Sequence, residues 1–242
     1  RYCVEDAEDR FAVFGARENR SPRSIRVPTL GDWLKSGSPS SRVIAISAKD
    51  RAAITLGGHH ADAAYWFNRQ SARFTSSRYY MAELPDWLTE FNGEDFFADG
   101  AAGYLPATWE HDAGTIRADD FPGEKNDDRR VSGHPLNQGT GPERATRLYY
   151  SAFMDELTLQ LVYRAIELQS LGQRGVTDLL ALSLSSIDTV GHRYGPYSAE
   201  SEDTLRRLDQ LLGDLLDRLD RQLAGDYIRS EEHTSELQSP DH

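Results

Sequence analysis

The chain has 242 residues, with 39 Asp and Glu against 27 Lys and Arg, so its formal net charge is −12. This balance excludes general nucleic-acid binding, which requires a basic face. It is compatible with a phosphate substrate, because a bound metal and a few local cations dominate the field inside one pocket. Apolar residues make up 38% of the chain and aromatic residues 10%, which predicts a globular fold.

Cysteine content and hydropathy exclude two further classes. Cys3 is the only cysteine, so neither a disulfide framework nor a cysteine metal cluster forms within this chain. No run approaches the 18 or so apolar residues of a membrane span. The chain begins at Arg1 without a leader, so we expect it to enter a longer protein partway through. Nothing in the sequence specifies an oligomeric state.

The first half of the chain predicts alternating helices and strands. A short helix over 29–35 has Thr29 as its cap, and the apolar, β-branched run 42–48 predicts a buried strand. The segments 63–67 and 73–76 are expected to pair as a hairpin, and 83–91 shows helical spacing. From Asn92 to about Ala145 the pattern is lost, which predicts an irregular surface excursion or substrate-side insertion rather than an interdomain linker.

Regular patterns return in the second half. A helix over 151–171 has an apolar stripe (Leu157, Leu161, Ala165 and Leu168), and 178–184 predicts a second buried strand that leads to Asp188. A long helix follows over 199–223, with a predicted buried side of Leu205, Leu208, Leu212, Leu215, Leu219 and Leu223. This succession predicts an α/β fold, a mainly parallel central sheet with helices on both faces.

The most distinctive candidate site is Asp188-Thr189-Val190-Gly191-His192, where the second buried strand ends. Open α/β sheets bind their ligands at such strand ends, and both Asp and His are zinc ligands. The alternative is that Asp188 caps the following turn and His192 is an ordinary loop residue, because this spacing often arises by chance.

Lys49 and Arg51 follow the other buried strand and form a second candidate site. An Arg that binds bidentately and a Lys that acts as a point charge together form a cationic clamp for a phosphoryl group. The alternative is a solvated charged loop. A metal role is also open for the adjacent His59 and His60, although such pairs usually face solvent, whereas His111, His134 and His233 have no partner at a useful spacing.

Several segments together resemble one family, the PafA-type bacterial alkaline phosphatases, whose wider relatives are the type I phosphodiesterases and nucleotide pyrophosphatases. The matching stretches cover roughly residues 1–228 as an internal fragment of an alkaline-phosphatase-like catalytic domain. They are 49–54, 58–67, Tyr79-Tyr80-Met81, Leu84-Pro85-Asp86-Trp87, 183–196, Glu202-Asp203-Thr204 and Arg207-Leu208-Asp209.

The resemblance implies a zinc-dependent hydrolase of phosphate monoesters that acts through a phosphoryl-enzyme intermediate and uses two zinc ions. By that resemblance, Asp188 and His192 are two ligands of one zinc, and Lys49 and Arg51 contact the non-bridging phosphoryl oxygens. Lys49 favours monoesters, since the phosphodiesterase relatives typically lack it. The resemblance also implies a small-molecule phosphate ester as substrate and a periplasmic or secreted location.

The resemblance further implies that the fold is incomplete. The nucleophile and its neighbouring ligand are expected before Arg1, and the remaining ligands after the helix that ends near Leu223, so this chain by itself is expected to be inactive. Residues 229–242 resemble a translated sequencing adapter, and Asp241-His242 within them is not counted as a ligand pair. Two other functions stay open: a phosphodiesterase or nucleotide pyrophosphatase, and a non-catalytic binding module with a structural Asp–His pair.

Overall fold

A four-stranded sheet with strand order β3-β2-β1-β6 forms the centre of the chain. The computed structural model describes residues 2–6, 8, 10–97, 105–119 and 133–230. The strands are β1 (Val43–Ser47), β2 (Ala63–Asn68), β3 (Arg73–Thr75) and β6 (Leu179–Ser183). β1 pairs in parallel with both β2 and β6, and β3 pairs antiparallel with β2. The mainly parallel sheet and the hairpin are therefore confirmed.

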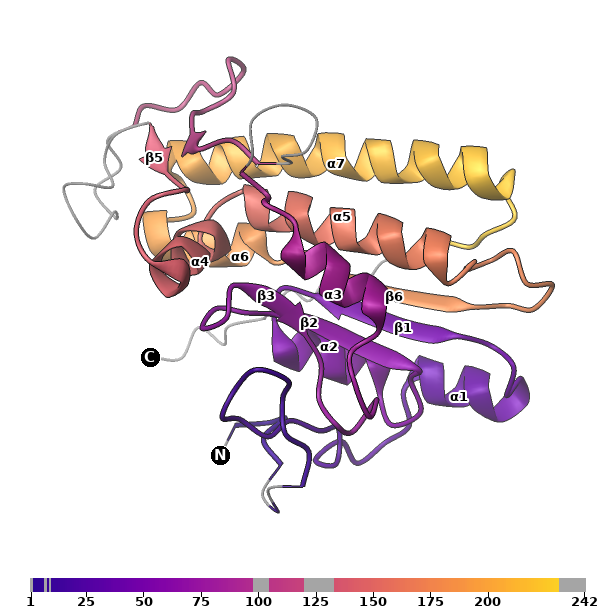
Figure 1. The fold of residues 1–242 in the computed structure, drawn as a ribbon. Helices are drawn as coiled ribbons and strands as arrows, with labels where there is room; N and C mark the ends of the chain where they lie inside the picture. The colour runs from indigo at the N-terminus through magenta and orange to yellow at the C-terminus, as the bar shows by residue number, and fades with distance from the viewer. Residues whose placement is uncertain (1, 7, 9, 98–104, 120–132, 231–242) are drawn as a thin grey trace, which may run out of the picture.

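Helices cover both faces of this sheet, as predicted (Figure 1). One face packs on α2 (Asp50–Gly57), against which α1 (Leu30–Gly37) also lies. The other face carries α5 (Phe153–Leu168) and α3 (Asp86–Gly93), and α7 (Ala199–Leu223) packs on α5 and on α6 (Ser186–Tyr194).

The residues of β1 divide the core into two parts. Ile44 and Ile46 lie in the larger cluster under α5, whereas Ala45 lies in the smaller cluster with Ile54 and Trp66. Successive side chains of a strand point to opposite faces of the sheet. Residues 43–46 are apolar at successive positions because helices cover both sides of this strand, which explains why they show no alternation of polar and apolar residues.

Helix boundaries follow local capping chemistry. Thr29 and Asp32 form a capping box at the start of α1, which satisfies two backbone N–H groups that the helix leaves unpaired. The Ser198 side chain accepts a hydrogen bond from the backbone N–H of Ser201 at the start of α7. The long helix begins and ends at the residues that its sequence pattern predicts.

Burial differs from the prediction in three elements. Leu215 of α7 is buried, but Leu205 is 60% exposed and Leu212 is exposed as well. α7 packs on α5 and α6, whereas Leu205 lines an open hollow together with Ile116 and Arg117. Leu168 at the end of α5 is also exposed, and β6 is only partly buried because its one described partner strand is β1.

The segment 92–145 contains more regular structure than its sequence pattern suggests. Its described residues include an antiparallel pair of two-residue strands, β4 (Thr108–Trp109) and β5 (His134–Pro135), and the start of α4 (Gly141–Tyr149). Trp109 and Leu136 belong to the main core. Strands of two residues are too short to produce a periodic pattern, which is why the sequence gives no sign of them.

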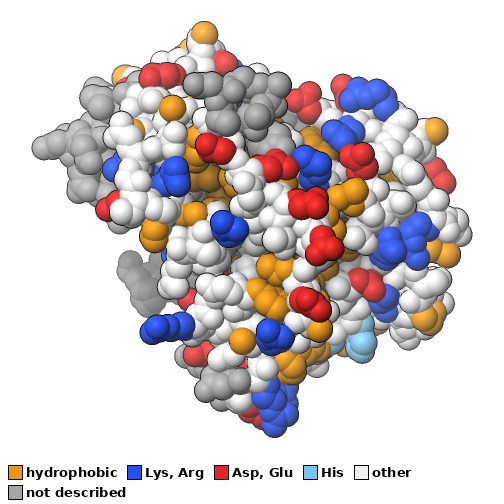
Figure 2. Space-filling model, viewed as in Figure 1, with side chains coloured by type: hydrophobic (Ala, Val, Ile, Leu, Met, Phe, Trp, Pro, Cys, Tyr) orange, Lys and Arg blue, Asp and Glu red, His pale blue; other side chains and the backbone are white. Residues whose placement is uncertain are grey.

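The surface carries charges of both signs. Figure 2 shows acidic and basic side chains interspersed with apolar ones on the face seen in Figure 1. Among the helices that the structure describes, none is both long and apolar enough to cross a bilayer. Within the proposed tail 229–242, only Arg229 and Ser230 are described, and they form neither helix nor strand.

Candidate active site

Two neighbouring strand ends bring the predicted site residues together. Ser47 of β1 pairs in register with Ser183 of β6, so the chain leaves both strands at the same edge of the sheet. Lys49 is the N-cap residue of α2, and Asp188 lies in the first turn of α6. The amino-terminal ends of both helices therefore lie at this edge, where the positive ends of the helix dipoles favour an anion.

Lys49 and Asp188 are in direct contact. The Lys49 ammonium donates a hydrogen bond to Asp188 Oδ2 across 139 positions of sequence. Burial alone would raise the pKa of Asp188, but the hydrogen bond and charge of Lys49, with smaller contributions from His192 and Arg51, outweigh it and lower that pKa. The carboxylate is thus kept ionised, which is the form that binds a metal.

His192 lies close to Asp188, and both side chains are of types that bind zinc. It lies one helical turn after Asp188, and its Nε2 is 3.3 Å from Asp188 Oδ1. Ligand atoms about 2.1 Å from a tetrahedral zinc ion are about 3.4 Å apart, so the pair fits one zinc. Both side chains are open to solvent, with 52% of Asp188 and 76% of His192 exposed. The pair is therefore accessible to a metal and to a substrate.

Asp50, between the two predicted cations, fixes the start of α2. It accepts hydrogen bonds from the Tyr2 hydroxyl and, at 2.6 Å, from Arg20 Nε. Burial and the Asp50 carboxylate raise the pKa of Tyr2 to about 12. The Arg51 side chain lies beside the same Tyr2 hydroxyl. The N-terminal segment thus holds Lys49 and Arg51 at the strand end.

Asp155 is a positioning residue that the sequence analysis missed. It lies in the first turn of α5, is 2% exposed, and accepts hydrogen bonds from the backbone N–H groups of Ser185 and Ser186 at 2.7 and 3.1 Å. These residues lead directly into the helix that carries Asp188. An Asp among apolar residues at the start of a buried helix was the available signal.

His59 and His60 lie at the opposite end of the sheet, where α2 ends and β2 begins. Both rings approach the buried Asp32, with Nδ1 of His59 at 3.3 Å and Nδ1 of His60 at 3.0 Å. Asp32 also accepts the backbone N–H groups of Thr29, His59 and His60. This contact connects α1 to the loop after α2, and it does not involve the candidate active site.

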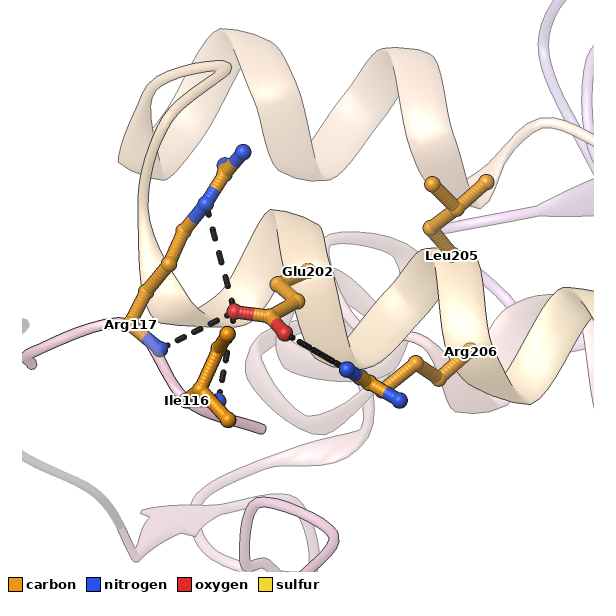
Figure 3. Close-up of a pocket in the computed structure, with 5 residues that line it drawn as sticks. All are labelled: Ile116, Arg117, Glu202, Leu205 and Arg206. Carbon is orange, nitrogen blue, oxygen red and sulfur yellow. Dashed lines mark hydrogen bonds and ion pairs between the residues drawn. The ribbon is translucent and has the colours of Figure 1, made fainter. Parts of the chain in front are cut away.

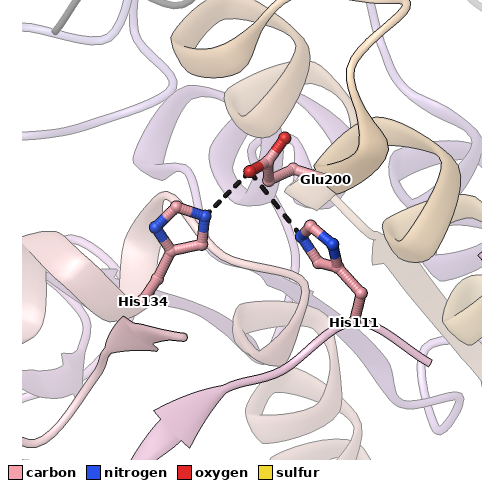
Figure 4. Close-up of side chains that lie close together, drawn as sticks. All are labelled: His111, His134 and Glu200. Atoms are coloured by element: carbon pink, nitrogen blue, oxygen red, sulfur yellow. Dashed lines mark hydrogen bonds and ion pairs between the residues drawn. The ribbon is translucent and has the colours of Figure 1, made fainter. Parts of the chain in front are cut away.

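His111 and His134, which have no partner at a useful spacing in the sequence, meet in the fold. The structure places both beside Glu200 of α7 in a buried cluster (Figure 4). His134 Nε2 lies 2.8 Å from Glu200 Oε1, and His111 Nε2 lies 3.6 Å from the same oxygen. The three residues are far apart in sequence, so no local spacing indicated this cluster. His233 lies outside the described residues.

Two surface hollows lie beside α7 and α6 rather than over Lys49, Asp188 and His192. The larger hollow, about 310 Å³, lies between α7 and the segment that contains Ile116 and Arg117 (Figure 3). There Glu202 accepts the backbone N–H groups of Ile116 and Arg117 at 3.3 and 3.0 Å, and it also pairs with Arg206. The smaller hollow, about 200 Å³, includes Arg193 and Tyr194 at the end of α6.

Fold and site together define an α/β protein with an Asp–His pair and two cationic side chains at the carboxyl ends of parallel strands. Comparison with known proteins makes the class specific. Residues 5–228 match the family described as type I phosphodiesterase / nucleotide pyrophosphatase, and the chain belongs to this family.

Its relatives include alkaline phosphatases. The chain is 36% identical to alkaline phosphatase PhoV of Synechococcus elongatus over 94% of its length, and 31% identical to alkaline phosphatase PafA of Elizabethkingia meningoseptica over 94%. It superposes on the crystal structure of wild-type PafA with a TM-score of 0.70, at 30% identity over 92% of this chain and 44% of that one. It spans 42% of PhoV and 43% of the PafA sequence, less than half of either relative.

Proposed function

We propose that the complete protein to which this chain belongs hydrolyses phosphate monoesters with two zinc ions. The observation that carries the proposal is the position of Asp188, whose two carboxylate oxygens face a cation and a second metal ligand. Lys49 contacts Oδ2, and His192 Nε2 lies 3.3 Å from Oδ1. A metal-ligand pair beside a cation at a strand end is the arrangement that phosphoryl transfer needs.

Each residue of the chain has a distinct part in this proposal. Asp188 and His192 would hold one zinc, which when bound supplies a positive charge that activates the nucleophile or stabilises the leaving oxygen. Lys49 and Arg51 bind the non-bridging oxygens of the phosphoryl group and stabilise the negative charge that develops on them. The amino-terminal ends of α2 and α6 add the favourable field of the helix dipoles.

The phosphoryl group would pass to a nucleophile of the complete protein, and water would then release it as phosphate. For this chain alone we expect a metal half-site and no hydrolysis, because two ligands bind zinc weakly. The purified chain with zinc should hydrolyse a nitrophenyl phosphate no faster than its Lys49→Ala variant. A rate of hydrolysis clearly above that of Lys49→Ala would contradict the expectation that this chain holds only half of a metal site.

A diesterase is the second candidate, because the matched family is described by phosphodiesterase and nucleotide pyrophosphatase activities. Lys49 distinguishes the two. A monoester carries one more anionic oxygen than a diester, so an additional cation favours it. In the complete protein, Lys49→Ala should lower kcat/KM for a monoester by about 100-fold or more and that for a diester much less.

The matched control for that experiment is Lys35→Ala. Lys35 is also a partly buried lysine that pairs with an aspartate, Asp62, at 2.8 Å, but it belongs to α1. The Lys35→Ala substitution should leave the monoesterase and diesterase activities unchanged. Equal losses for monoester and diester in Lys49→Ala would contradict monoester specificity. If Asp188→Ala and His192→Ala leave the number of zinc ions bound by the complete protein unchanged, a binding module in which this pair is structural would be favoured instead. A periplasmic or secreted location is part of the same proposal.

A further inference from the structure

A second cluster of metal-ligating side chains lies away from the candidate active site. His111 follows β4, His134 belongs to β5, and Glu200 lies in the first turn of α7. Their ligand atoms all lie within 4.8 Å of one another (Figure 4). His134 is buried, His111 is mostly buried, and Glu200 is 0% exposed. Three segments distant in sequence therefore converge on one enclosed point.

The hydrogen bonds of this cluster are incomplete. Among the residues that the structure describes, Glu200 Oε2 and His111 Nε2 are buried and have no hydrogen-bond partner. Asp119 Oδ1 is also buried and has no hydrogen-bond partner among the described residues. Buried polar atoms in proteins almost always have a partner, and unpaired ones are costly. Several unpaired atoms of ligating type in one cluster indicate that they share a ligand.

Two carboxyl groups and two imidazoles lie together in this cluster. Asp119 lies beside Glu200, and Glu200 lies beside both His111 and His134. Two adjacent carboxyl groups with two imidazoles need either protons on the rings or a metal ion between them. A divalent cation balances both carboxylates and leaves the imidazoles neutral.

We propose that His111, His134 and Glu200 bind a divalent transition-metal ion of the zinc type, at a structural site separate from the candidate active site. Two imidazoles and one carboxylate are a donor set that zinc accepts. The ligand atoms of a tetrahedral zinc ion are about 3.4 Å apart, and the distances from Glu200 Oε1 to the two rings are 2.8 and 3.6 Å. Asp119 lies beside Glu200 and is a further carboxylate at this cluster.

The position of the cluster indicates its structural role. The metal would fasten the β4–β5 pair to the start of α7. Tyr194, the last residue of α6, packs against this point, with its ring centroid 5.0 Å from that of His134 and 5.8 Å from that of Trp109. Between the two helices Gly195 has a φ of +102°, and the hydroxyls of Ser198 and Ser201 donate to its carbonyl oxygen. The cluster thus supports the corner that follows the helix carrying Asp188 and His192.

The test uses the whole 242-residue chain in an Asp188→Ala/His192→Ala background, which removes the candidate active-site ligands. After loading with zinc and desalting, this variant should retain about one zinc per chain. Adding His111→Ala should lower zinc affinity by more than about 100-fold, because a lost ligand costs more than the 10–100-fold of an outer-shell change. His60→Ala is the matched control, since His60 is an exposed histidine on a loop, and it should retain the metal.

A second measurement needs no substitution inside the cluster. Cobalt added to the background variant should give the visible absorption of a tetrahedral site with nitrogen and oxygen ligands, and zinc should raise its Tm. Failure to retain zinc, together with an unchanged Tm and no cobalt spectrum, would overturn the proposal. The cluster would then be a protonated hydrogen-bond network. Because the background lacks Asp188 and His192, this result is independent of the proposed phosphatase function.

Discussion

Ser47 and Ser183 lie opposite each other in the parallel pairing of β1 with β6. This pairing explains why Lys49 and Asp188 meet although 139 positions separate them. Each strand ends at the same edge of the sheet, and a helix starts within a few residues of each end. Strand order and register thus bring the two residues to the same place, and side-chain conformation decides only whether they are in direct contact.

Asp155 should make the chain less stable as the pH rises from about 4 to 6. Burial raises its pKa from 3.8 to about 6, although the N–H groups of Ser185 and Ser186 oppose that shift. Between these pH values the folded chain binds more protons than the unfolded chain, so unfolding free energy falls with rising pH, by up to about 3 kcal/mol. Urea denaturation at several pH values should show this slope, and Asp155→Asn should flatten it. An unchanged slope in the variant would contradict the assignment.

Asp32 should have the opposite pH dependence. Burial acts to raise its pKa, but the backbone N–H groups of Thr29 and His60 and the two histidine rings outweigh burial and lower it. Its contribution to stability is therefore present above about pH 4 and is lost as the pH falls. Asp32→Ala should cost about 2–4 kcal/mol at neutral pH, because it removes a cap and leaves buried N–H groups unpaired.

Asp86 provides the control for this measurement, because it is an exposed acid in the first turn of α3. Asp86→Ala should change the unfolding free energy by less than about 0.5 kcal/mol. Equal effects of the two substitutions would show that Asp32 acts only through the helix dipole.

Asp203 should be essential for attaching the segment before α4 to α7. Its buried carboxylate accepts hydrogen bonds from Trp109 Nε1 at 2.7 Å, from the Asp112 N–H at 2.6 Å and from Arg207 Nε at 2.7 Å. Asp203→Ala leaves these donors without their partner and should cost about 3–5 kcal/mol. Trp109 fluorescence during urea denaturation follows the loss. Asp209→Ala, at an exposed position of the same helix, should have little effect.

Gly31 allows α1 to pack closely on the sheet. A Cβ at this position would lie 2.6 Å from Val43 Cγ1 and 3.2 Å from the Gly57 carbonyl oxygen. Gly31→Ala should therefore destabilise the chain by about 1–3 kcal/mol, despite the higher helix propensity of alanine. At Gly37, in the same helix, a Cβ meets nothing within 4 Å. A thermal-unfolding comparison in which Gly31→Ala is no less stable than Gly37→Ala would contradict this packing argument.

The strands and long helices were predictable because their patterns are local. A run such as 42–48 identifies a buried strand by itself, and the cap at Thr29 identifies a helix start. Placement of Lys49 and Asp188 at strand ends followed from the same local patterns. Their proximity depends on the parallel pairing of β1 with β6, which the structure shows and the sequence pattern does not specify. The roles of these residues in catalysis stay predictions.

Features that depend on packing between distant segments were not predictable in this way. The exposure of Leu205 depends on which stripe of α7 contacts α5 and α6, and six leucines at helical spacing do not specify that choice. The cluster of His111, His134 and Glu200 arises through two-residue strands that lack any periodicity. For Asp155, the sequence shows an acid at a helix start but not the backbone that it binds.

The corner at Gly195 has a thermodynamic consequence. His192 and Glu200 lie on either side of it, only eight positions apart, and the Ser198 and Ser201 hydroxyls tie its two ends together. Ordering this corner lowers the entropic cost of binding on both sides, so occupancy of the cluster should tighten zinc binding at Asp188 and His192. Linkage makes the effect reciprocal. Zinc titrations should therefore show cooperative rather than independent loading of the two sites.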